Sequence, residues 1–100
     1  MKINIKSSNM DLTEAIKNYA DEKLGAIDKY FDNIQNIEVE VGKTTRGQQK
    51  GDIFFCEINV SVPRKLLRYR EETDDLYKAI NDVKKGIQLE IKKYKEKIRA

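Results

Sequence analysis

The chain has 100 residues, 39% hydrophobic and 37% charged, so it is long enough for one domain with its own core and too apolar to be disordered. It has no histidine and one cysteine, which excludes an internal disulfide, His-assisted nucleophilic catalysis and an ordinary zinc site. The net charge is only +3, but residues 61–100 hold 12 Lys and Arg against seven acids, and residues 1–60 hold eight against ten. We expect a single domain, 1–100, with its positive field in the second half.

The chain is expected to begin with a short strand, in which Ile3 and Ile5 alternate with polar residues. Since no secretory signal precedes it and no apolar run reaches the ~20 residues of a membrane span, we expect a cytoplasmic protein. Asp11 and Thr13 both offer an N-cap for a helix over about 13–31. Lys23 projects close to the apolar stripe of this helix, so its ammonium can reach the rim shared with the second helix.

Three further strands are predicted in the middle of the chain. The second and third alternate apolar with polar residues, Pro63 ends the third, and the fourth has the charged pattern of an edge strand. The predicted segments are a strand at Ile37–Val41, a polar hairpin loop at Gly42–Gly51 carrying Lys43, Arg46 and Lys50, a strand at about Ile53–Val62 and a strand at Lys65–Glu71.

The second helix, Asp75–Arg99, is the longest and most basic element. Its apolar stripe comprises Leu76, Ile80, Val83, Ile87, Ile91, Tyr94 and Ile98, and the opposite side carries Lys78, Lys85, Lys92 and Arg99 at every seventh position. Such a row is often only a solvated face. From Lys78 onward, however, eight Lys and Arg face three acids, and this excess favours a polyanionic partner.

The element order β-α-β-β-β-α predicts an α+β fold, a two-layer sandwich with a four-stranded mixed sheet and both helices on one face. The uncovered face would be polar, and there Phe55 stands among Glu38, Glu40 and Glu57. A sheet that binds RNA needs exposed aromatic residues to stack bases, so the helices are the better candidate for an RNA surface.

Signals for other chemistry are absent or have a structural explanation. Cys56 lies in an alternating apolar run and is expected to be buried. The glycines form no phosphate loop, and the adjacent acids Glu71-Glu72 and Asp74-Asp75 are explained by the start of a helix. We therefore expect no enzyme, cofactor, metal site or small-molecule substrate.

The segment from Arg70 to Asn81, REETDDLYKAIN, followed by Lys92-Lys93-Tyr94-Lys95, resembles the short-form ribosome hibernation-promoting factors, a family that also includes the ribosome-associated inhibitor. The similarity covers nearly the whole chain, including TEAI at the start of the first helix and Glu22-Lys23-Leu24 within it. Because the chain ends just beyond the second helix, we expect it to lack the C-terminal dimerising domain of the long form.

This resemblance implies a translation inhibitor that occupies the messenger and transfer-RNA cleft of the small ribosomal subunit, contacts ribosomal RNA, and acts in the stress response of stationary phase. It also implies a monomer off the ribosome. Together with the basic row, it implies RNA-binding residues at Lys23, Lys78, Lys85, Lys92, Lys93, Lys95 and Arg99. The alternative is a protein-interaction module that regulates a transcription factor through the same basic surface.

Three departures from the family concern individual contacts. Ser7-Ser8 replaces a Gly-basic pair, Asn81 replaces an Asp, and Gly86 and Leu89 stand where Lys and Arg are common. Gly86 also costs the helix about 1 kcal/mol relative to Ala.

Overall fold

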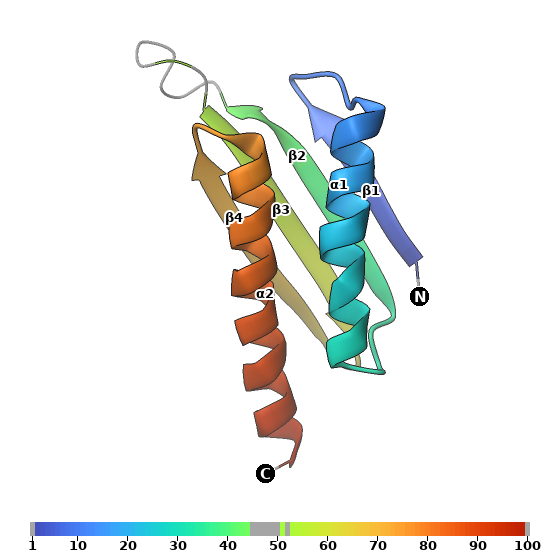
Figure 1. Ribbon diagram of the computed structural model, residues 1–100. Coiled ribbons are helices and arrows are strands. Elements are labelled where there is room, and N and C mark those ends of the chain that lie inside the picture. Colours follow the sequence, from blue (N-terminus) through green and yellow to red (C-terminus); the bar gives the residue numbers. More distant parts are fainter. Residues whose placement is uncertain (1, 45–50, 52, 100) are drawn as a thin grey trace.

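The computed structural model describes residues 2–44, 51 and 53–99, without the side chains of Lys2, Tyr30 and Arg99. The elements are β1 (Lys2–Ser8), α1 (Glu14–Gly25), a short 3₁₀ helix η1 (Ala26–Tyr30), β2 (Asn36–Thr44), β3 (Ile53–Val62), β4 (Lys65–Thr73) and α2 (Leu76–Arg99). This order confirms the α+β fold predicted from the sequence (Figure 1). No helix in the described parts of the chain combines the length and apolarity needed to cross a membrane.

The sheet has the strand order β1-β2-β3-β4. β1 pairs with β2 in parallel across the α1 crossover, and the two hairpin pairs are antiparallel. Both helices cover the same face of this sheet (Figure 1), as expected for a two-layer sandwich. The core lies between the layers, where Val39 and Ile58 of the central strands meet residues such as Ile80 and Ile87 of α2.

Three element ends differ from the sequence prediction, the smallest difference being that β4 ends at Thr73 and not at Glu71. The first helix ends at Gly25 and continues as the 3₁₀ helix η1, and Leu24 and Ile27 on either side of this change are both buried. β2 continues through Gly42 to Thr44, which pairs with Ile53, so the predicted loop is shorter than expected. Its residues 45–50, including Arg46 and Lys50, lie outside the described residues.

Each of the two α-helices begins at a side-chain cap. The backbone N–H of Ile16 donates to Thr13 Oγ1 at 3.2 Å, so of the two predicted caps Thr13 takes the role at α1. At α2, Asp75 Oδ1 accepts from the backbone N–H groups of Tyr77 at 3.0 Å and Lys78 at 3.4 Å. The acidic residues before α2 are thereby explained in part by capping.

Cys56 is fully buried on β3, as predicted. Desolvation, together with the charge of Glu57, raises the pKa of its thiol to about 12, so the reactive thiolate is scarce at pH 8. We expect a thiol reagent to modify the native protein at least ~100-fold more slowly than the unfolded chain at pH 8. Cys56→Ala should lower the free energy of unfolding by about 1 kcal/mol, measured by urea titration. Rapid labelling of the native thiol would contradict the prediction that Cys56 is inaccessible and largely protonated.

Candidate nucleic-acid interface

The solvent-facing side of α2 carries the predicted cationic row. The residues that α2 buries against the sheet are Leu76, Ala79, Ile80, Val83, Gly86, Ile87, Ile91 and Tyr94. Lys78, Lys85 and Lys92 are exposed on the opposite side, since at 100° per residue they lie within about 40° of one line. Arg99 continues the row in sequence, but its side chain lies outside the described part of the structure.

Ile98 corrects the predicted apolar stripe. We expected it to be buried, but it is 55% exposed. Figure 1 shows the reason, because the C-terminal end of α2 extends past the end of the sheet and has no opposing layer there. The stripe therefore ends at Tyr94, whose hydroxyl donates to the Pro63 carbonyl at 2.8 Å.

A hollow on α2 brings three of the predicted lysines together. It has a volume of about 650 Å³ and is lined by Lys85, Gln88, Leu89, Ile91, Lys92, Lys95 and Glu96. Lys85 and Lys92 come from the cationic row, while Lys95 is half-buried and lies on the side of α2 that faces α1. Three cations beside the apolar lining residues Leu89 and Ile91 are the groups that an anion with an apolar part would require.

The remaining predicted lysines lie apart from this hollow. Lys78 is at the start of α2, where Asp75 caps the helix and Asp82 is one turn further on. Lys93 is exposed and pairs with Glu90, with 3.4 Å between Nζ and Oε2. Lys85, Lys92 and Lys95 form the centre of the candidate site because all three line the hollow, whereas Lys78 and Lys93 are not part of its lining.

Lys23 belongs to a cluster between the helices. Its Nζ lies 5.6 Å from the ring centroid of Tyr19, which contacts Tyr77 of α2 edge-to-face at 4.8 Å between centroids. The Asn81 side-chain amide donates to the Tyr19 hydroxyl at 2.7 Å. This hydrogen bond from Asn81 links α2 to α1. A carboxylate at this position could not donate it, because an ionised carboxylate only accepts hydrogen bonds. Lys23 does reach the rim shared by the helices, as predicted.

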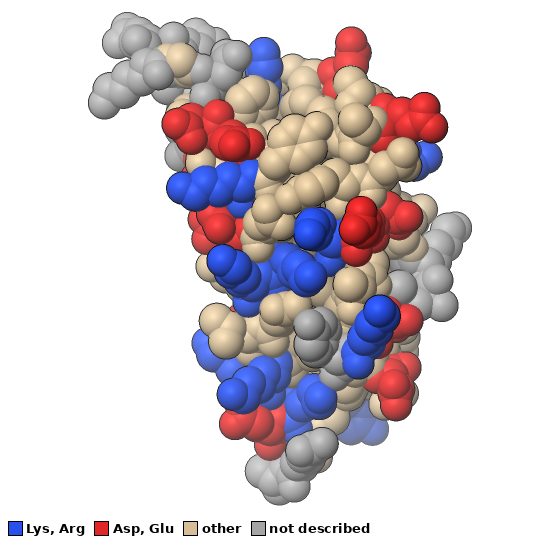
Figure 2. Space-filling view, viewed as in Figure 1, with Lys and Arg blue, Asp and Glu red and all other residues tan. Residues whose placement is uncertain are grey.

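The charge is divided across this face of the molecule. Figure 2 shows Lys and Arg side chains gathered over the middle and lower parts of α2 and between the helices, and Asp and Glu mainly near the top and along the outer side of α1. An extended polyanion would therefore be attracted to the C-terminal half of α2 more strongly than to the end where the helices begin.

Gly86 has a packing role that its helix propensity did not reveal. A Cβ at this position would lie 2.2 Å from the Tyr69 ring of β4, so the ring lies directly on the helix backbone. The Tyr69 hydroxyl donates to Glu71 Oε1 at 3.0 Å, and this bond, with the charge of Glu71, raises the Tyr69 pKa. The close approach of β4 to α2 explains why a glycine occupies a helix interior.

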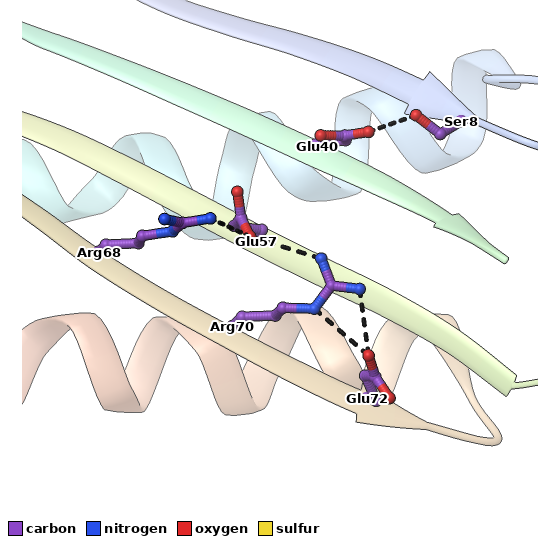
Figure 3. A network of polar contacts seen from close by, with 6 residues as sticks. All are labelled: Ser8, Glu40, Glu57, Arg68, Arg70 and Glu72. Carbon is purple, nitrogen blue, oxygen red and sulfur yellow. Dashed lines mark hydrogen bonds and ion pairs between the residues drawn. The ribbon is translucent and has the colours of Figure 1, made fainter. Parts of the chain in front are cut away.

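The uncovered sheet face carries a network of paired charges. Figure 3 shows Arg70 between Glu57 and Glu72, with nitrogen to oxygen distances of 3.4 and 3.1 Å, and Arg68 reaches Glu57 at 3.1 Å. Burial works to raise the Glu57 pKa, but the hydrogen bonds and charges of both arginines outweigh it and hold this pKa below its ordinary value. Glu57 therefore stays ionised at neutral pH.

Phe55 is on this face but does not offer a stacking surface. It is only 6% exposed, and the Arg70 guanidinium carbon lies 4.1 Å from its ring centroid. Nearby, Ser8 donates to Glu40 and Asn4 to Glu38, which adds further carboxylates. An aromatic ring under an arginine and among acids cannot stack RNA bases, so the helix layer remains the candidate interface.

The fold and the basic helix layer define a class, a two-layer α+β domain with a cationic face on its second helix. The chain belongs to the family described as Sigma 54 modulation protein / S30EA ribosomal protein, whose family model matches residues 3–99. This confirms the resemblance found in the sequence.

Three relatives illustrate the similarity. The chain is 30% identical over 98 residues to a ribosome hibernation promotion factor of Staphylococcus aureus (strain COL), covering 98% of this chain and 50% of that protein, so it spans about half the length of this relative. A solved ribosomal subunit interface protein from Coxiella burnetii has a TM-score of 0.83 at 23% identity, with 96% of this chain and 99% of that chain covered. The Protein Y N-terminal domain of Thermus thermophilus has a TM-score of 0.74 at 29% identity, covering 94% and 99%.

Leu89 and Gln88 are site residues that sequence reasoning had not assigned. Leu89 is 59% exposed in the middle of the cationic side. Its helical position opposite the buried stripe can be read from the sequence, and an apolar residue at such a position is the signal by which sequence reasoning could have found it.

Proposed function

We propose that this chain is a ribosome-binding translation inhibitor, a hibernation factor that occupies the messenger and transfer-RNA cleft of the small subunit. In this proposal the basic surface of α2 contacts ribosomal RNA phosphates in the cytoplasm, residues 1–100 act as one ribosome-binding domain, and the protein is a monomer off the ribosome. The observation that carries it is the convergence of Lys85, Lys92 and Lys95 on one hollow of α2. Family membership and the name of the Staphylococcus aureus relative support the ribosome as the partner.

The charge distribution supports RNA as the ligand and the helix layer as the interface. Lysines bind phosphates through charge and counterion release, which requires no exact geometry. On the opposite face Glu57 and Glu72 are paired with Arg68 and Arg70, so these arginines are less available to phosphates than the lysines of α2. The protein would therefore enter an RNA-lined cleft with its helices toward the RNA.

Co-sedimentation with purified small ribosomal subunits tests this proposal. The protein should pellet with small subunits at ~100 mM salt, should be released as salt increases, and should inhibit translation in a cell-free system. A protein that stays in the supernatant at low salt, with its fold intact by circular dichroism, would contradict the proposal.

A second candidate function is regulation of a transcription factor. The first half of the family description, Sigma 54 modulation protein, favours it. Binding to purified sigma 54 and to small subunits at the same ionic strength separates the two candidates. Tighter binding to sigma 54 would favour the transcriptional function, whereas tighter binding to small subunits is the result we expect.

A further inference from the structure

The hollow on α2 has features that binding to phosphate alone does not require. From Lys85 to Glu96 it runs along about 16 Å of helix, at 1.5 Å per residue. Lys85 and Lys92 flank Leu89 along the helix, and Leu89 exposes 59% of its surface. A row that met only phosphates would gain nothing from an exposed leucine in its middle, since a phosphate would lose water against it without a compensating hydrogen bond.

We propose that this hollow takes one unstacked nucleotide of an RNA strand, and this inference rests on the proposed function above. The base would lie on Leu89 and the aliphatic stems of the lysines, while its flanking phosphates would meet the ammonium groups of Lys85 and Lys92. The Gln88 amide lies in the same lining and can hydrogen-bond a base edge as donor and acceptor.

The chemistry of the lining favours this occupant over two others. A paired duplex keeps its bases stacked inside the helix, so it could use the lysines but not Leu89. An acidic protein segment would satisfy the lysines through its carboxylates, but it would cover Leu89 only if it carried an apolar side chain at the matching position, whereas every nucleotide carries a base. Glu96 lies at the C-terminal end of the hollow, where it disfavours a phosphate and so places the phosphates toward Lys85 and Lys92.

The hollow is on α2, and Figure 2 shows uncharged side chains between the basic ones over the lower half of this helix. Its volume of about 650 Å³ is within the ~300–1,000 Å³ that pockets for small organic ligands occupy. The hollow therefore has room for one nucleotide, and its lining offers apolar groups for the base and cations for the phosphates.

The test compares a single-stranded oligoribonucleotide with a fully paired RNA duplex of the same length, each fluorescently labelled, at one ionic strength. Leu89→Ser should bind the single strand about fivefold more weakly than the unmodified chain, the loss expected when roughly 40 Å² of apolar surface is no longer buried. Duplex affinity should stay within about twofold, and the slope of log affinity against log salt should not change, because no cation is removed.

The matched control is Leu66→Ser. Leu66 is a similarly exposed leucine, at 57%, but it lies on β4 on the uncovered sheet face. This variant should bind both RNAs as the unmodified chain does.

Four results would overturn the inference. The first three are equal weakening of both RNAs by Leu89→Ser, an unchanged single-strand affinity, and competition by polyglutamate as effective as that by unlabelled single strand. Binding of free AMP or GMP as tightly as the oligonucleotide would also overturn it, since the strand would then be unnecessary. The outcomes are separate from those of the proposed function. A chain that pellets with small subunits but shows no Leu89 effect loses only this inference, and a chain with the Leu89 effect that fails to pellet loses only the ribosome as partner.

Discussion

Reversing two charges in the centre of the cationic surface should weaken binding to small subunits by at least ~100-fold. In the proposed complex, Lys85→Glu with Lys92→Glu removes two phosphate contacts and places two carboxylates beside the RNA backbone. Both side chains are exposed and point away from the core, so the free energy of unfolding should change by less than ~0.5 kcal/mol per site. The slope of log affinity against log salt should also fall, by about 0.7–0.9 for each lost contact.

The matched control is Lys17→Glu with Lys29→Glu. Both residues are exposed, Lys17 on α1 and Lys29 on η1, and the change in net charge is the same. Lys43 is less suitable because its Nζ lies 5.8 Å from the Phe54 ring centroid, so its replacement would also alter packing. If long-range attraction alone governed binding, both double variants would lose affinity equally; that outcome, with both proteins folded, would rule out the α2 surface as the binding site.

Much of the fold was predictable because apolar residues repeat with the periods of strands and helices. The alternation in β3 places Ile58 in the core and Glu57 on the other face, as the structure confirms. The end of α1 was not predictable, since five residues are too few to separate a repeat of 3.6 from one of 3.0. The extension of β2 was hidden because Gly42 is a typical loop residue, and only its neighbours across the sheet show that it belongs to a strand.

The sequence predicted which side of α2 carries the candidate site, but it did not predict the shape of that site. A seven-residue repeat alone places Lys85 and Lys92 on one line opposite the core. The hollow depends on how far each side chain stands out from the helix, and its lining does not include Lys93, which pairs with Glu90. Ile98 was wrongly expected in the core because periodicity contains no information on where the sheet under a helix ends.

Gly42→Ala should lower the free energy of unfolding by about 3 kcal/mol, an unusually large loss for one methyl group. A Cβ at Gly42 would lie 2.3 Å from the Ser8 carbonyl oxygen and 2.8 Å from the Phe55 ring. The oxygen belongs to the backbone of β1, which pairs with β2 at this position, so relief requires the two strands to separate locally. Urea titration followed by circular dichroism measures the loss.

Gly25→Ala is the matched control for this glycine. Its backbone is helical and the nearest atom to the added Cβ would be 3.9 Å away, so the change should stabilise the protein by about 0.5–1 kcal/mol through helix propensity and reduced freedom of the unfolded chain.

A double-mutant cycle with Phe55→Ala identifies which of the two close contacts of the added Cβ causes the loss of stability. If the backbone oxygen of Ser8 governs the loss, Gly42→Ala should cost about 3 kcal/mol whether Phe55 is present or not, because removing the ring does not move β1. If the ring governs it, the cost should fall to below about 1 kcal/mol in the Phe55→Ala background, since the added methyl group would then occupy space that the ring had filled. We expect the first result, because a ring can rotate about its side-chain bonds while a carbonyl oxygen within a strand pair cannot move without breaking the pairing.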